Sequence, residues 1–384
     1  MPRGTLVPIT PSVLEWALNE SGYSAEAAAQ KIKVPADRLR AWVRGDTEPT
    51  LTEFRRLATL LKRAPATFLL PRPPERPPLA VDFRRAPGNE RSELNPVERR
   101  YLRDSRRLQE LLLWIQGELG EPAALLPQRN TTTNPEAVAA EVSASLLPAR
   151  PEAGFKTPSH AFNWYRQALE SAGVLVFTFP LGRDGVRGFS IWNDRGPVVA
   201  VNTWWRVEAR TYTLFHEFGH LLTRTSSACV EAGRRFARPS DSVERWCEEF
   251  AAAVVLPRDA VERFLTRELG RPDANVSDLG VPSKIASRFR VSLRAATLRL
   301  IDLNRATWDL YEQIPPASEN KPPGGGGSGR GRGEIREDQY GDRTVKLMVS
   351  ALHRDVLGRT DVLDALDISD IDLSKLERRA ARSA

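Results

Sequence analysis

Apolar side chains recur at helical spacing in four short runs between residues 11 and 70. These runs predict helices over Val13–Asn19, Ser24–Ile32, Pro35–Arg44 and Thr52–Leu61. Residues that start and stop helices stand at the right places, because Ser24 suits an N-cap, Pro35 a first turn and Gly45 the residue after a helix. We therefore predict a small all-helical domain over residues 1–72.

A proline-rich stretch follows this domain, and a long amphipathic run comes after it. Prolines dominate residues 71–78, which predicts a stiff, extended segment. Residues 95–119 begin rich in arginine and end rich in leucine, with apolar positions at helical spacing. We assign residues 73–120 to a linker and a long connecting helix.

From residue 135 the pattern mixes helical and strand periodicities. It predicts two helices, three strands and then four more helices, over 136–146, 159–172, 174–180, 188–192, 198–202, 205–223, 241–256, 259–268 and 283–303. This mixture predicts an α+β domain over residues 121–317. Glycine dominates the stretch 318–334, which predicts a flexible linker, and short apolar runs in 335–384 predict a small C-terminal helical domain.

The composition is that of a folded chain without a membrane span or a disulfide framework. Its 384 residues are 41% hydrophobic and 27% charged, which excludes wholesale disorder and leaves room for two or three domains. The sequence has no run of about 18 uncharged apolar residues, and it has only two cysteines. We expect a cytoplasmic protein that makes no membrane contact. A net charge of +7 permits a nucleic-acid partner without establishing one.

Two of the four histidines lie in one pentapeptide, His216-Glu217-Phe218-Gly219-His220, which has the pattern HExxH. Residues i and i+4 of a helix project from one face, so both imidazoles could reach a single Zn²⁺ ion. A bound zinc ion lowers the pKa of a coordinated water, and Glu217 would lie beside that water as the general base. The pattern predicts one catalytic Zn²⁺ per chain with His216 and His220 as ligands.

A third protein ligand is expected downstream, because catalytic zinc sites usually have three. The spacing of metzincins is excluded, since Thr223 and Ser226 stand where that pattern needs glycine and histidine. Glu244 and Glu248 lie one turn apart in the predicted helix 241–256, as the ligand glutamate and a supporting carboxylate do in gluzincins. We predict Glu244 as the ligand and Glu248 as the hydrogen-bond partner of the outer nitrogen of one histidine. An exchange of these roles, or a solvated helix face, stays open.

The surrounding residues resemble the ImmA/IrrE family of metallopeptidases. The resemblance lies in RTYTLFHEFGHLL over residues 210–222 and ERWCEEFAAAVVLP over 244–257, and it covers roughly residues 80–310. Cys247-Glu248 departs from the Ala-Asn that the family usually has there. The resemblance implies an α+β zinc endopeptidase that cleaves a helix-turn-helix transcriptional repressor and so derepresses stress, mobile-element or phage-related genes.

Residues 11–70 resemble the Xre/Cro type of helix-turn-helix in AAQKI at 28–32, LRAWVRG at 39–45 and EPT at 48–50. In that fold the helix that starts at Pro35 would enter the major groove of DNA. Its candidate contacts are Ala36, Asp37, Arg38, Arg40 and Arg44. Asp37 would meet negative phosphates unless it accepts a hydrogen bond from cytosine, so the domain could instead bind a protein partner or form a homodimer.

Three functional hypotheses remain open. The first is a zinc endopeptidase that cleaves a repressor, and it is favoured because Glu217 is present. The second is a DNA-binding regulator whose peptidase-like domain senses a ligand or partner without turnover, and the third is defence-related control through another target. Substrate would add as a strand beside Val198–Asn202, or that segment is an internal core strand. Tyr212 and His160 are candidate oxyanion donors, although a structural role is favoured for each.

Overall fold

The computed structural model describes residues 5–74, 94–124, 126–151, 154–225, 227–229, 242–315 and 331–380, and side chains of 227–229 are left out of the description. The chain divides into two compact units. The first contains residues 1–80 and 91–104, and the second contains 81–90 and 105–384. Among the described helices, none combines the length and apolar character that a bilayer crossing requires.

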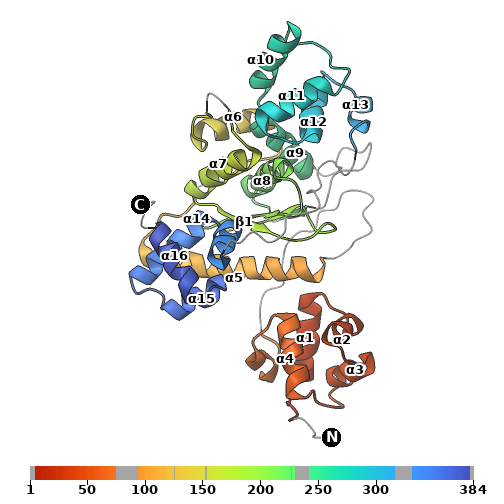
Figure 1. Ribbon diagram of the computed structural model, residues 1–384, viewed down its shortest axis with the longest axis vertical. Coiled ribbons are helices and arrows are strands. Elements are labelled where there is room, and N and C mark those ends of the chain that lie inside the picture. The colour runs from red at the N-terminus through yellow and green to blue at the C-terminus, as the bar shows by residue number, and fades with distance from the viewer. Residues whose placement is uncertain are drawn as a thin grey trace. The chain divides into compact units, whose positions relative to one another are not determined.

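The first unit is all-helical, as predicted. It consists of α1 (Pro11–Ser21), α2 (Ala25–Ile32), α3 (Ala36–Arg44), α4 (Leu51–Leu61), the 3₁₀ helix η1 (Pro65–Leu69) and the start of α5 (Pro96–Leu119) (Figure 1). Ser24 caps α2, and Thr50 and Glu53 form a capping box at α4. Leu39 and Trp42 of α3 are buried in the core of this unit, so α3 presents its charged residues on its other side.

The second unit contains a four-stranded sheet in the order β1-β3-β2-β4. The strands are β1 (Leu175–Phe179), β2 (Gly188–Ile191), β3 (Val198–Asn202) and β4 (Ser227–Cys229). β1 runs parallel to β3, whereas β2 is antiparallel to both β3 and β4. The suggestion that substrate adds beside Val198–Asn202 is wrong, because β3 is internal and hydrogen-bonds to a strand on each side.

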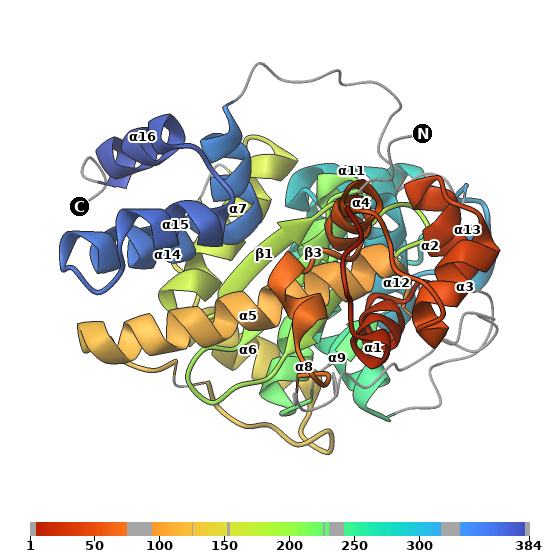
Figure 2. The ribbon, with the colours of Figure 1, turned by 90° about the horizontal axis from the view of Figure 1, so that it is seen from below.

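Helices cover both faces of this sheet, which explains why every residue of β1, β2 and β3 is buried. Figures 1 and 2 show α7 (Pro158–Ser171) and α8 (Val207–Leu222) on one face and the second half of α5 across the other. Gln109 of α5 donates a hydrogen bond to the Gly196 carbonyl, 2.7 Å away, in the turn between β2 and β3. The sheet is therefore the middle layer of this unit.

The remaining helices before the C-terminal segment build outward from α8. They are α6 (Pro135–Ser145), α9 (Ser242–Val255), α10 (Arg258–Leu269), α11 (Gly280–Phe289), α12 (Leu293–Asp302) and α13 (Trp308–Glu312). α9 packs on α8, α6 and α12 pack on α9, and α11 packs on α12. The prediction of a single helix over 283–303 is wrong, because this segment forms two helices, α11 and α12. Arg290 takes a left-handed conformation with a φ of 58° and ends α11, and Ser292 then caps α12.

The C-terminal helices α14 (Arg332–His353), α15 (Arg359–Leu366) and α16 (Asp370–Ala380) belong to the same compact unit as the sheet. α14 bends at Gly341 and lies along β1. Arg166 of α7 donates to the Asp338 carbonyl at 2.7 Å and pairs with Glu170 at 2.9 Å, and burial raises the pKa of Glu170. This buried pair fixes α14 on the sheet. The sequence did not predict that contact.

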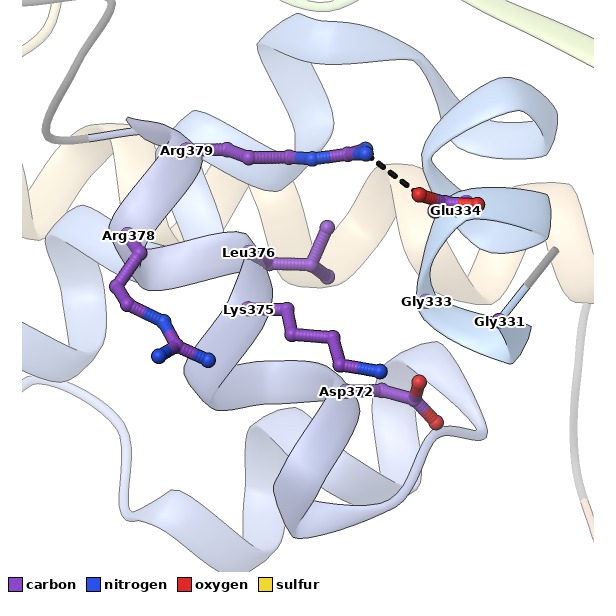
Figure 3. Close-up of a pocket in the computed structure, with 8 residues that line it drawn as sticks. All are labelled: Gly331, Gly333, Glu334, Asp372, Lys375, Leu376, Arg378 and Arg379. Carbon is purple, nitrogen blue, oxygen red and sulfur yellow. Dashed lines mark hydrogen bonds and ion pairs between the residues drawn. The ribbon is translucent and has the colours of Figure 1, made fainter.

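A polar cleft lies between the start of α14 and α16 (Figure 3). Arg379 pairs with Glu334 at 2.6 Å across it. The Asp372 carboxylate accepts hydrogen bonds from the Ser369 hydroxyl and from the Gly333 backbone, which lower its pKa, and the nearby Lys375 lowers that pKa further. Because opposite charges meet within the cleft, we interpret it as part of the packing of the C-terminal helices.

Candidate metal centre

Helix α8 presents two imidazoles on one face. His216 and His220 are one turn apart, and their neighbours Leu214, Phe215, Phe218, Leu221 and Leu222 are buried against the sheet and surrounding helices. Both histidines are themselves buried, with relative exposures of 7% and 0%. The apolar residues of α8 thus hold the helix in place. The two imidazoles share one of its faces, as the i, i+4 spacing predicted.

Helix α9 brings a carboxylate to the two imidazoles. The Nε2 atoms of His216 and His220 are 3.3 Å apart, and each is 3.3 Å from one oxygen of Glu244. Two ligands about 2.1 Å from a tetrahedral zinc ion lie about 3.4 Å from each other. The three donors therefore have the identity and spacing that a tetrahedral Zn²⁺ ion requires, and among the described residues they form a His-His-Glu group able to hold a metal.

Close packing of α8 on α9 produces this convergence. Gly219 of α8 faces Cys247 of α9, and a Cβ atom at position 219 would lie only 3.1 Å from the Cys247 Sγ. A side chain at 219 would therefore require α9 to shift at Cys247, one turn from Glu244. Cys247 is buried, and its place against Gly219 gives it a packing role.

The charges of His216 and Glu244 depend strongly on each other. Burial alone would lower the pKa of His216, but hydrogen bonding to Glu244 and the nearby Glu217 and Glu248 carboxylates raise it to about 9. Burial alone would raise the pKa of Glu244, but the two imidazoles hold it well below its usual range. At neutral pH His216 is therefore protonated in the absence of metal, and a cation that binds there must displace this proton.

This charge state predicts that zinc affinity depends on pH. A zinc ion must displace the proton of His216, so we expect the apparent affinity to rise about tenfold per pH unit between about pH 6 and 8 and to level off above about pH 9. Competition with a chromophoric chelator, corrected for the protonation of the chelator, measures this slope. A flat profile would show that His216 is already neutral in the metal-free protein.

Glu217 is completely buried beside the metal ligands. Its charge raises the pKa of His216, which places the carboxylate near that imidazole. On its other side lies Gly188 of β2, where an added Cβ would come within 3.0 Å of the Glu217 Cγ and 2.8 Å of the Ala200 carbonyl oxygen. Glycine at 188 therefore leaves space for the Glu217 side chain. No pattern in the sequence indicated this role of Gly188.

Glu248 lies one turn beyond Glu244 on α9. Burial, together with the negative charges of Glu244 and Asp302, raises the pKa of Glu248 to about 7 despite the opposite influence of His216. Its predicted role as the partner of the outer nitrogen does not apply to His220, whose Nδ1 lies 3.0 Å from the Thr225 hydroxyl. A hydrogen bond from the outer ring N–H of His216 to the Glu248 carboxylate stays a prediction.

The two candidate oxyanion donors make structural contacts. The Tyr212 hydroxyl donates to the Glu248 carbonyl at 3.1 Å, and burial raises the pKa of Tyr212 well above its usual value. His160 lies in the first turn of α7, where its Nδ1 accepts a hydrogen bond from the Lys156 backbone at 3.4 Å. These contacts favour the structural interpretation of both residues.

The five candidate DNA contacts all lie on α3 in the first unit, and acidic side chains pair with its arginines. Arg38 pairs with Glu53 at 3.0 Å, Arg44 with Asp46 at 2.7 Å, and Arg40 with both Asp37 at 2.7 Å and Glu26. The Asp37 side chain is 93% exposed, whereas Ala36 packs partly against the core. The surface of α3 thus carries less free positive charge than its three arginines suggest.

Comparison with protein families agrees with both units. Residues 169–300 match a metallopeptidase family model described as the IrrE N-terminal-like domain. Residues 14–68 match the helix-turn-helix family. No curated protein sequence matches the chain. The first match contains all three candidate metal ligands, and the second contains α3.

Proposed function

Starting from an IrrE N-terminal-like domain and a helix-turn-helix domain in one chain, we propose that this protein is a zinc-dependent endopeptidase that cleaves a helix-turn-helix transcriptional repressor. Cleavage would derepress genes of stress response, mobile elements or defence. The observation that carries the proposal is the convergence of His216, His220 and Glu244 beside the buried Glu217.

The proposed chemistry divides between the metal and the chain. When bound, Zn²⁺ supplies a Lewis acid that polarises a peptide carbonyl and makes water acidic. His216, His220 and Glu244 would hold the ion. Glu217, at the same end of the site as His216, would accept a proton from the attacking water and deliver it to the amine that leaves.

The sheet order supports one path for the substrate backbone. Among the described residues β4 is the terminal strand of the sheet, beside β2, and it begins at Ser227, shortly after the turn that ends α8. An extended substrate segment would add at the outer edge of β4, where main-chain hydrogen bonds could hold it near His220. We thus propose β4, instead of Val198–Asn202, as the strand beside which substrate adds.

Intact-mass spectrometry of helix-turn-helix repressors encoded beside this gene tests the proposal. Each repressor is co-expressed with the wild-type chain or with Glu217→Gln, and zinc is quantified in the same samples. Discrete fragments that appear only with the wild type would identify the substrate and the cut. Bound zinc with every repressor intact would favour the alternative, a DNA-binding regulator whose peptidase-like domain works without turnover.

The helix-turn-helix domain is proposed to bind DNA through α3, and the paired arginines predict how. We expect Asp37→Asn to raise the affinity for duplex DNA and to steepen its salt dependence, with a slope larger by up to about 0.9. The exposed carboxylate no longer repels phosphates, and Arg40, left with Glu26 as its acidic partner, can turn toward one phosphate. Fluorescence anisotropy on promoter DNA over a range of salt concentrations measures both effects.

Asp259→Asn, which makes the same chemical change at an exposed position of α10, is the matched control. A loss of affinity in Asp37→Asn would instead indicate that Asp37 accepts a hydrogen bond from a base. Absence of any binding at low salt would exclude the DNA role and leave a protein partner for this domain.

A further inference from the structure

We propose that Thr225 is a positioning residue that fixes the imidazole of His220 with Nδ1 protonated, so that Nε2 presents its lone pair to the metal. The inference rests on the proposed zinc site and deepens it. Nδ1 of His220 lies 3.0 Å from the Thr225 Oγ1, whereas Nε2 points toward Glu244 and His216. The two nitrogens of one ring thus have distinct partners.

The hydrogen bonds of the Thr225 hydroxyl favour this tautomer. Its oxygen lies 3.1 Å from the His220 carbonyl, to which it can donate, and 3.0 Å from the Thr223 hydroxyl. Either contact can take the hydroxyl hydrogen and leave an oxygen lone pair for the Nδ1–H of His220. A histidine that donates from Nδ1 in this way has its lone pair on Nε2, which is the atom at the metal site.

A turn with a non-glycine residue in the left-handed conformation places Thr225 beside the His220 imidazole. The Thr225 N–H donates to the His220 carbonyl at 2.9 Å, and the Arg224 N–H donates to the Leu221 carbonyl at 3.2 Å, which together form a Schellman motif at the end of α8. The left-handed position of this motif usually belongs to glycine. Here it is Arg224, with a φ of 59°, a conformation that is unfavourable for a residue with a Cβ.

The side chain of Arg224 explains why an arginine occupies this position. Its guanidinium lies 3.6 Å from the centre of the Trp192 ring, and Nη2 donates to the Leu126 carbonyl at 2.7 Å. These contacts fix the turn to β2 and to the segment before α6. The turn therefore holds the Thr225 hydroxyl in one place relative to His220, and a glycine at 224 would provide no such anchor.

Zinc affinity of the full chain tests the proposal, with Zn²⁺ itself as the probe and a chromophoric chelator as the competitor. We expect Thr225→Val, which replaces the hydroxyl by a methyl group of similar size, to weaken zinc binding by about 10–100-fold. Thr225→Ser keeps the hydroxyl and should remain within about threefold of the wild type. Thermal unfolding of the metal-free variants shows whether each is folded.

Thr223→Val is the matched control. The Thr223 hydroxyl donates to the Gly219 and His220 carbonyls in the same turn and lies 3.0 Å from the Thr225 hydroxyl. Without it, the Thr225 hydroxyl can still donate to the His220 carbonyl and accept from Nδ1 of His220. Equal losses of affinity in Thr223→Val and Thr225→Val would overturn the proposal, since they would reflect the turn as a whole. So would a Thr225→Val affinity within about threefold of the wild type.

Two further outcomes are defined in advance. If Thr225→Val does not fold, Thr225→Ala removes the same hydroxyl and gives the same comparison. If the wild-type chain does not bind one zinc ion, the proposed function fails together with this inference. Normal zinc binding by the wild type with an unaffected Thr225→Val overturns the inference alone.

Discussion

Glu217→Gln is expected to leave zinc bound and to lower the rate of substrate cleavage by about 10²–10⁴-fold. Glutamine keeps the volume of the buried side chain, so the space between α8 and Gly188 stays filled. It cannot accept the proton of the attacking water, and it cannot pass that proton to the departing amine. The measurement is the cleavage rate of an identified substrate, with zinc content determined on the same protein.

Glu249→Gln is the control for this variant, because it makes the same chemical change at an exposed position of α9. It should cleave at the wild-type rate. Unchanged cleavage in Glu217→Gln would exclude Glu217 as the general base. Loss of zinc together with loss of cleavage would indicate that Glu217 supports the metal site. The loss of cleavage would then follow from the missing metal and would not support a role in proton transfer.

Glu244→Ala is expected to weaken zinc binding by more than about 100-fold, because even residues that only orient a ligand contribute about 10–100-fold to metal affinity. The structure gives this residue a special position, since its two oxygens lie 3.3 Å from the two imidazoles. Removing the carboxylate leaves two neutral ligands and removes the negative charge that balances the cation. Chelator competition, with metal content by mass spectrometry, measures the loss.

Glu248→Ala distinguishes the two carboxylates of α9 that the sequence left interchangeable. We expect it to weaken zinc binding much less than Glu244→Ala does, because Glu244 is the carboxylate that contacts both imidazoles. A larger effect at Glu248 would reverse the assignment. Stoichiometric zinc in Glu244→Ala at micromolar metal would remove Glu244 from the ligand set.

The part of the site that depends on a single helix could be predicted from the sequence. His216, Glu217 and His220 are fixed relative to one another by the geometry of α8, which the spacing specifies. The third donor depends on how α8 and α9 pack, and that packing is set by contacts such as Gly219 against Cys247. The sequence therefore restricted the choice to Glu244 and Glu248, and the three-dimensional arrangement brings Glu244 to both imidazoles.

Features that depend on distant segments were missed or misjudged. Thr225 follows the HExxH pattern closely, yet it reaches His220 only because Arg224 adopts a left-handed conformation, which is rare outside glycine and asparagine. The sequence pattern predicts the strands β1, β2 and β3 but not their order in the sheet, so the internal position of β3 between β1 and β2 could not be foreseen. Likewise, the acidic partners Glu26 and Glu53 of the α3 arginines lie on neighbouring helices, and a pattern read along α3 alone cannot reveal them.

The seat of α14 on β1 changes how the glycine-rich stretch 318–334 is understood. Arg166 and Glu170 hold the bend of α14, and Tyr340 packs edge-on against the buried Phe177 and Phe179. The stretch therefore joins two parts of one compact unit. The C-terminal helices pack on the sheet as a separate subunit of a complex would, although they belong to the same chain. Cut within that stretch, the two fragments should copurify and reassemble in trans, and dissociation of the fragments on a sizing column would contradict this.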